Sequence, residues 1–182
     1  MPEKKSRRVS CVRVNAKLER KLERMRGEMV KIVMGPSCAG KSTYIKEHFP
    51  NSTVVDLYEC QEKYQVMNYT NVIQSYIDAK EELVQAIKEG KDVVLEHTLL
   101  KSKRRPMYIN AIKEVTDEPI VIYVLLPTAE QLDLNMYDRL GYHPGIDECR
   151  KILDFIDIPT TEEGFSDVVL VRYADCSTHI LS

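Results

Sequence analysis

The sequence lacks the features that mark membrane, secreted and zinc-binding proteins. It contains no apolar run near the roughly 18 to 20 residues that cross a bilayer, and its basic N-terminus has no apolar signal segment. Its five cysteines form no CxxC pair, and its four histidines form no HExxH or HxxxH pair. These spacings exclude a disulfide framework and a zinc site. We therefore expect a soluble, intracellular (cytoplasmic) protein with reduced, mostly buried cysteines and no membrane partner.

Charge is distributed unevenly along the 182 residues, which carry a net charge of −2. Residues 1–26 hold ten of the 26 basic residues and three of the 28 acidic ones, so this segment is +7 and the remainder −9. A basic arm can bind DNA or RNA by charge alone, although such runs are frequently just solvated. We predict a basic arm or helix over 1–27 and a catalytic domain over 28–182.

Short apolar segments alternate with helical patterns along most of the chain. Strands are expected over 29–34, 53–57, 92–95, 119–126 and 167–171. Helices are expected over 16–27 after Asn15, 41–47, 71–89, 103–115 capped by Ser102, 128–139 capped by Thr128, and 146–155. This alternation predicts an α/β fold of three layers, a parallel sheet of about five strands with helices on both faces. The glycine-flanked segment 141–145 is where a small lid would sit.

The segment after the first predicted strand matches the Walker A pattern G-x-x-x-x-G-K-[ST]. Its glycines let backbone amides approach phosphate oxygens. The lysine brings a mobile charge to the β- and γ-phosphates, and the hydroxyl of Ser42 suits Mg²⁺. The predicted nucleotide-binding residues are Gly35, Pro36, Ser37, Cys38, Ala39, Gly40, Lys41, Ser42 and Thr43. The predicted cofactors are therefore ATP, or another nucleoside triphosphate, and Mg²⁺.

Two carboxylates follow the predicted strands that flank the loop strand. Asp56 ends the apolar run Val54-Val55, and Glu96 follows the run 93–95. The carboxyl ends of strands point into the crevice where open α/β sheets bind ligands. One carboxylate could hold a magnesium-bound water, a role open to Glu96, and the other could accept the proton of an attacking hydroxyl.

Phosphoryl transfer also needs cations around the transferred group, worth about 10³–10⁵ in rate where an arginine finger supplies them. The candidates are Arg139, which precedes the lid segment, and the pair Arg104 and Arg105. Together with Lys41 and Asp56, Arg139 completes the predicted catalytic set.

The order of these motifs resembles that of the P-loop polynucleotide-kinase-like family. The matching segments are GPSCAGKST, VVD, VVLEHTLLKSKRR, YVLLP followed by LDLN, and IPTTEEGFSDVVLV, within residues 29–172. The resemblance implies a parallel sheet with a lid, ATP and magnesium, and transfer to a hydroxyl. It makes Thr98 similar to a threonine near the acceptor and Arg139 similar to the lid arginine.

The acceptor side departs from the family pattern. The expected base is either Asp56, which stands slightly earlier than the family's aspartate, or Glu59, which stands slightly later. The arginine that usually follows the aspartate is absent. The predicted acceptor-binding residues are Glu59, Glu96, Thr98, Arg104 and Arg105. Three functions stay open: a kinase for a hydroxyl of DNA or RNA, which the resemblance and the arm favour; a kinase for a nucleoside, nucleotide, sugar or antibiotic; and an NTPase switch module.

Overall fold

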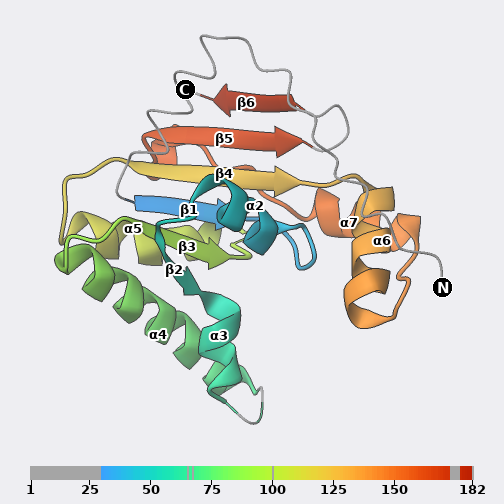
Figure 1. Cartoon of the computed structure of the whole chain (residues 1–182), viewed down its shortest axis with the longest axis horizontal. Helices are drawn as coiled ribbons and strands as arrows, with labels where there is room; N and C mark the ends of the chain where they lie inside the picture. The colour runs from blue at the N-terminus through green and yellow to red at the C-terminus, as the bar shows by residue number, and fades with distance from the viewer. Residues whose placement is uncertain (1–29, 65, 67, 100, 173–176, 182) are drawn as a thin grey trace.

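A computed structural model describes residues 30–64, 66, 68–99, 101–172 and 177–181. The basic arm and the helix predicted over 16–27 lie outside these residues, so the boundary predicted at residue 27 stays a prediction. Within the described part of the chain, a six-stranded sheet runs through the molecule with helices on both sides (Figure 1). Element labels follow Figure 1.

Five parallel strands form most of the sheet, in agreement with the sequence prediction. They are β1 (Val30–Met34), β2 (Thr53–Asp56), β3 (Val93–His97), β4 (Ile120–Leu126) and β5 (Asp167–Arg172). The spatial order is β2-β3-β1-β4-β5-β6, and the sixth strand β6 (Ser177–Leu181) pairs antiparallel with β5. The sequence analysis missed β6. β1 lies between β3 and β4, so the strand that ends at Asp56 does not flank the loop strand as the sequence analysis expected; β2 lies one strand further out. The carboxyl end of β1 opens into the central crevice of the sheet.

The helices connect these strands largely where the patterns place them, except for one short helix after β2 that the sequence analysis missed. They are α2 (Lys41–His48), α3 (Leu57–Glu62), α4 (Tyr69–Lys88), α5 (Arg105–Lys113), α6 (Ala129–Leu140) and α7 (Ile146–Asp154), with single 3-10 turns at Ser102–Arg104 and Thr161–Glu163. The Oγ1 atom of Thr128 accepts the amide of Gln131 at 3.1 Å, which confirms it as a helix cap.

Two local predictions were wrong. Leu57 was assigned to the second strand but begins α3, because Asp56 caps that helix by accepting the amide of Tyr58 at 2.8 Å. Ser102 was predicted to cap a helix, but it is the first residue of a 3-10 turn, and the α-helix starts only at Arg105. Its hydroxyl contacts the Asp157 carboxylate instead of the helix amides.

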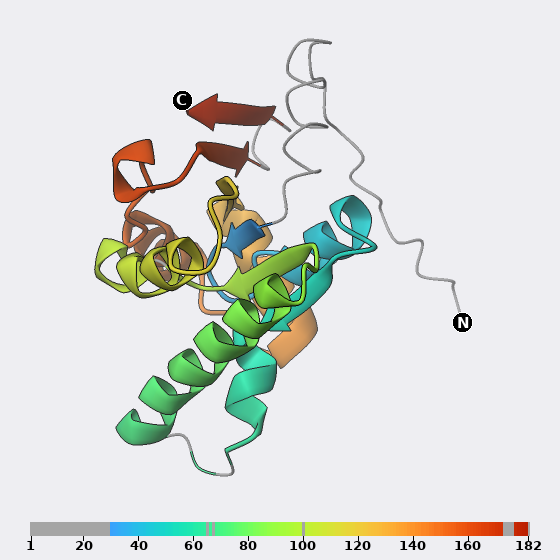
Figure 2. The same ribbon diagram turned by 90° about the vertical axis from the view of Figure 1, so that its left-hand side faces the viewer.

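Each face of the sheet packs against its own set of helices, because alternate strand residues point to opposite sides. Ile32, Leu95 and Ile122 lie in a large core under α3, α4 and α5, whereas Val33 and Val94 pack against α2 on the other face. Figure 2 shows α2 and α4 on opposite sides of the sheet. The molecule therefore has the three layers that the sequence predicts.

Helices α6 and α7 form a separate unit at the carboxyl ends of the strands (Figure 1). They share a small apolar core in which Leu132, Met136 and Cys149 pack with Cys38 of the loop after β1. The helix that precedes the predicted lid segment 141–145 is therefore packed against the loop. Cys38, Cys60 and Cys149 are free and buried, as predicted. No helix in the described ranges is long and apolar enough to cross a membrane.

Candidate active site

The Walker A loop joins β1 to α2, in the setting that the sequence predicts. A Cβ atom added to Gly35 would lie 2.9 Å from the carbonyl oxygen of Leu125, so no larger residue fits there. Gly40 has a φ of 84°, in the left-handed region that glycine adopts at low cost. The two glycines thus serve close approach and a tight turn, and they aim the first amides of α2 into the crevice.

Lys41 lies inside this loop. Its ammonium donates to the carbonyl oxygens of Gly35 at 3.2 Å and Pro36 at 3.0 Å. Burial lowers the pKa of Lys41, while the negative charges of Glu96 and Asp56 act in the opposite direction. The loop carbonyls hold the ammonium where incoming phosphate oxygens can replace them, since an ammonium binds an anion more strongly than a neutral carbonyl.

The side chains of Ser42 and Glu96 contact each other at the carboxyl edge of the sheet, although 54 positions separate them in the chain. The Ser42 hydroxyl donates to Oε1 of Glu96 at 2.8 Å. Two hard oxygen ligands beside the phosphate-binding loop fit Mg²⁺, which takes one or two protein oxygens and completes its shell with water and phosphate. No group of three or more His, Cys, Asp or Glu side chains within the described ranges could hold a metal by itself. The two oxygens of Ser42 and Glu96 therefore fit a magnesium ion that takes its other ligands from water and phosphate.

Glu96 is buried at the end of β3, beside Asp56 in the register of β2 and β3. Burial raises the pKa of Glu96, and the neighbouring Asp56 charge adds to this rise, while the Ser42 hydrogen bond opposes it. A buried carboxylate whose negative charge is not fully compensated is stabilised when a cation binds beside it. The electrostatics of this site therefore favour metal binding.

A cavity of about 480 Å³ opens over the loop. The loop and strand residues that line it were largely predicted, and α6 adds Arg139 together with two residues that the sequence analysis did not assign, Asn135 and Asp138. The Asn135 side-chain amide donates to the carbonyl oxygen of Cys38 at 2.8 Å, and so ties α6 to the loop. A signal was present in the sequence, because residues 135, 138 and 139 fall on one face of a helix.

Arg139 spans the opening of the crevice. Its guanidinium lies 5.7 Å from the ring centre of Tyr58, an exposed residue on α3, and its charge reaches both Lys41 and Glu96. A cation–π contact of this kind contributes about 0.5–1 kcal/mol at an exposed site. The contact is weak enough for Arg139 to leave Tyr58 for a phosphate.

The predicted acceptor residues differ in their burial. Thr98 follows β3 and is half-buried, and Arg104 is exposed with its guanidinium 4.7 Å from the ring centre of Tyr76. Neither Glu59 nor Asp56 lines the cavity. Glu59 is exposed on α3, whereas Asp56 is half-buried, lies beside Glu96 in the register of β2 and β3, and has one oxygen engaged as a helix cap. Between the two candidate bases, this placement favours Asp56, whose charge acts on Glu96 and Lys41.

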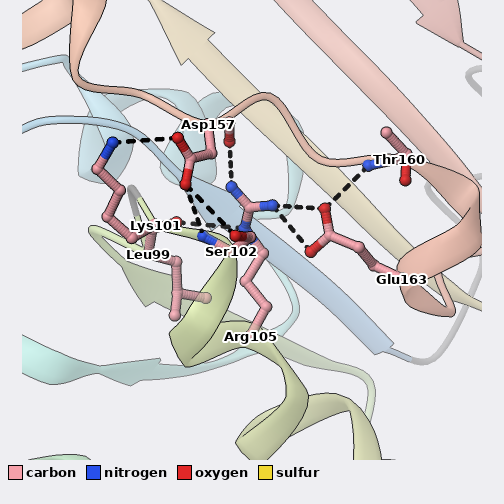
Figure 3. A network of polar contacts seen from close by, with 7 residues as sticks. All are labelled: Leu99, Lys101, Ser102, Arg105, Asp157, Thr160 and Glu163. Carbon is pink, nitrogen blue, oxygen red and sulfur yellow. Dashed lines mark hydrogen bonds and ion pairs between the residues drawn. The ribbon is translucent and has the colours of Figure 1, made fainter.

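Arg105 was predicted to bind the acceptor, and this prediction was wrong. Its side chain is fully buried, and its guanidinium makes two hydrogen bonds to Glu163, at 2.6 and 2.8 Å. The same guanidinium donates to the carbonyl oxygens of Leu99, at 3.3 Å, and Asp157 (Figure 3). The arginine therefore holds the segment after β3 against the segment before β5, and its donors are occupied within the protein.

His97 directly follows Glu96 in β3, and the sequence analysis assigned it no role. It is 2% exposed at the end of β3, between Tyr76 and Tyr108, with ring centres 5.2 and 5.1 Å away. Its Nδ1 accepts the amide of Leu99 at 3.0 Å, and its Nε2 has no hydrogen-bond partner among the described residues. Burial, with the positive charges of Lys41 and Arg104, lowers the pKa of His97 to about 3. The ring is therefore neutral.

Comparisons with known proteins support the fold that this geometry indicates. No family model and no curated protein matches the chain. Among solved structures, a gluconokinase from Sinorhizobium meliloti has a TM-score of 0.57 at 17% identity, over 80% of this chain and 82% of that one.

A sugar kinase from Janibacter gives 0.56 at 14% identity, over 80% and 85% of the two chains. The tunicamycin resistance protein of Deinococcus radiodurans gives 0.54 at 13%, over 78% and 86%. At these identities the likeness concerns the fold alone, and the chain adopts the three-layer α/β fold of P-loop kinases.

Proposed function

We propose that the protein is a magnesium-dependent kinase that transfers the γ-phosphate of ATP, or another nucleoside triphosphate, to a hydroxyl of a small molecule. The observation that carries the proposal is the contact of Ser42 with Glu96 beside Lys41. It brings a metal-binding hydroxyl, a carboxylate and a phosphate-binding ammonium together at the central crevice of the sheet. Phosphoryl transfer depends mainly on positioning and on charge stabilisation, which these groups can supply.

Each residue has a defined part in this proposal. The loop amides of residues 35–42 and Lys41 bind the β- and γ-phosphates, and Ser42 and Glu96 would hold Mg²⁺, Glu96 through a water. The magnesium ion supplies charge neutralisation between the phosphates when it is bound. Arg139 moves from Tyr58 to the transferred group, and Asp56 accepts the proton of the attacking hydroxyl.

A small acceptor is favoured over the nucleic acid that the resemblance and the basic arm favour. The gluconokinase and the sugar kinase are named for small molecules, and the comparisons give no support to a nucleic-acid substrate. The chain beyond residue 26 has a net charge of −9, and Asp56, Glu96 and Asp138 lie at or beside the crevice. Such charge repels a polyanion unless basic residues offset it.

A transfer assay with γ-labelled ATP tests the proposal. The acceptor panel contains sugars, sugar acids and nucleosides, together with 5′-hydroxyl DNA and RNA oligonucleotides, each with and without Mg²⁺. We expect label in a small molecule, only when Mg²⁺ is present. Label confined to oligonucleotides would make the protein a nucleic-acid kinase, and label confined to inorganic phosphate would make it an NTPase.

A pair of lysine variants connects the activity to the loop. Lys41→Met should reduce turnover by about 10²–10³, the loss typical of a single group that stabilises transition-state charge. Lys46→Met is the matched control, because Lys46 is an exposed lysine on the same helix, outside the cavity lining. Equal activity of the two variants would contradict the role of Lys41.

A further inference from the structure

A chain of hydrogen bonds fixes the orientation and the proton position of His97. The Arg105 guanidinium donates to the carbonyl oxygen of Leu99, and the amide of Leu99 donates to Nδ1 of His97. Leu99 has a φ of 40°, in the left-handed region that branched residues rarely adopt. The buried Arg105 therefore helps to hold a strained residue whose amide points back at the histidine.

This arrangement leaves one ring nitrogen as a donor. Because Nδ1 accepts a hydrogen bond, the proton of the neutral ring is on Nε2. That N–H is buried and has no partner among the residues that the structure describes. Buried polar groups without partners are rare in folded proteins, and each calls for a physical explanation. A donor of this kind is suited to an oxygen atom of a bound ligand.

The side chains next to His97 indicate what that oxygen belongs to. Tyr76, half-buried on α4, contacts both the His97 ring, with ring centres 5.2 Å apart, and the Arg104 guanidinium, 4.7 Å from the tyrosine ring centre. The charge of Arg104 also acts on His97 directly. A neutral N–H donor and an exposed guanidinium on the same tyrosine complement an anionic oxygen, since charge-assisted hydrogen bonds to carboxylates are the stronger kind.

The position of His97 relative to the phosphate site points to the acceptor. Glu96, the preceding residue, contacts Ser42, and the charge of Lys41 reaches the histidine. Consecutive strand residues face opposite sides of a sheet, so the nucleotide and a ligand at His97 would approach the end of β3 from different sides.

We propose that His97 and Arg104 bind the carboxylate of a small hydroxy acid whose hydroxyl receives the phosphate. The proposal rests on the proposed kinase function and adds the chemical class of the acceptor. Nε2 is out of contact with solvent, so entry of the ligand requires movement of the side chains that cover it. The carboxylate replaces the Tyr76 ring as the partner of the Arg104 guanidinium. One carboxylate oxygen accepts a hydrogen bond from the Nε2–H group of His97, and the proton stays on the ring.

Binding measured by NMR on the full chain, labelled with ¹⁵N in histidine, tests this directly. The probes are D-gluconate and D-glucitol, which share a six-carbon polyol skeleton and differ at the carboxylate. In the free protein we expect the Nε2–H tautomer of His97. Gluconate should shift the His97 Nε2 resonance, and glucitol should leave it in place. A His97 resonance that gluconate does not move, or an Nδ1–H tautomer, would overturn the proposal.

Variants separate a binding role from a structural one. His97→Phe and Arg104→Met should each weaken gluconate binding at least 10-fold and leave the affinity for Mg-ATP unchanged. His97→Gln, which restores an N–H donor, should recover part of the loss, and Lys103→Met is the control for removing an exposed charge on the same turn. Unchanged gluconate affinity in His97→Phe would show that His97 only packs against the tyrosines.

The failure of this inference is distinguishable from the failure of the proposed function. Labelled phosphate appearing on a neutral sugar, with no response of His97 to gluconate, would keep the kinase and refute the carboxylate site. A His97 that responds to gluconate in a protein that transfers no phosphate would keep the carboxylate site and refute the kinase.

Discussion

Replacing Arg105 with methionine should destabilise the protein strongly, although the sequence places this residue beside the acceptor. The fully buried guanidinium makes an ion pair with Glu163 and donates to two backbone carbonyls (Figure 3). Removing one partner of a buried pair costs about 3–5 kcal/mol, because the other charge stays behind uncompensated. The Glu163 side chain is 21% exposed and can regain some water, so we expect the lower end, about 3 kcal/mol.

Urea unfolding followed by circular dichroism measures this loss as a free energy of unfolding, and thermal unfolding measures it as a fall in Tm. For a chain of this size each kcal/mol shifts Tm by about 2–4 °C, so Tm should fall by about 6–12 °C. Arg104→Met is the matched control, since it loses only a cation–π contact of about 0.5–1 kcal/mol with Tyr76. If Arg105→Met unfolds within about 0.5 kcal/mol of wild type, as an ordinary surface variant does, the structural role of Arg105 is refuted.

Three further predictions follow from the site. Burial raises the pKa of Glu96 above its ordinary value of 4.5, so the native carboxyl binds its proton more tightly than the unfolded one. Wild-type stability should therefore fall as pH rises through and above 4.5. Glu96→Gln should then be more stable than wild type at pH 7, with no such gain below the pKa of the unfolded carboxyl. Equal urea midpoints at pH 7 would contradict this. Gly35→Ala should cost about 1–3 kcal/mol and weaken Mg-ATP binding, because its Cβ would lie 2.9 Å from the Leu125 carbonyl oxygen. An unchanged nucleotide affinity in calorimetry would refute the close-approach argument. Asn135→Ala removes the hydrogen bond between α6 and the carbonyl oxygen of Cys38 in the loop, so amide exchange in α6 should rise while Mg-ATP still binds. Unaltered exchange would mean that apolar contacts alone hold α6 against the loop.

The loop half of the candidate site could be located from the sequence because its residues are local. Eight consecutive residues contain the glycines, the ammonium and the hydroxyl, and an apolar strand before them with a helix after them fixes their geometry. Glu96 could be assigned from its place at a strand end, since the carboxyl ends of parallel strands share one edge. The contact of Glu96 with Ser42 needed the strand order, which places β3 beside β1.

The acceptor half could not be predicted, because its residues are distinguished only by distant partners. Arg104 and Arg105 are adjacent in the sequence, yet one is exposed and the other is paired with Glu163, 58 positions away. A helix start does not state which of two arginines faces the interior. The role of His97 depends likewise on the backbone angle of Leu99, which no residue pattern at this position signals.

The end of β3 explains how one strand can serve the two substrates that we propose. Glu96 contacts Ser42 on the α2 side of the sheet, and His97 packs against Tyr76 and Tyr108 on the α4 and α5 side. Pleating alone produces this division, because neighbouring strand residues alternate in direction. A substitution at His97 can therefore alter acceptor selection while the metal ligands stay in place, whereas a one-residue shift of β3 would exchange the two sides and destroy both functions. The Arg105 network holds the residues directly after β3, and so its free energy supports the register on which both binding sites depend.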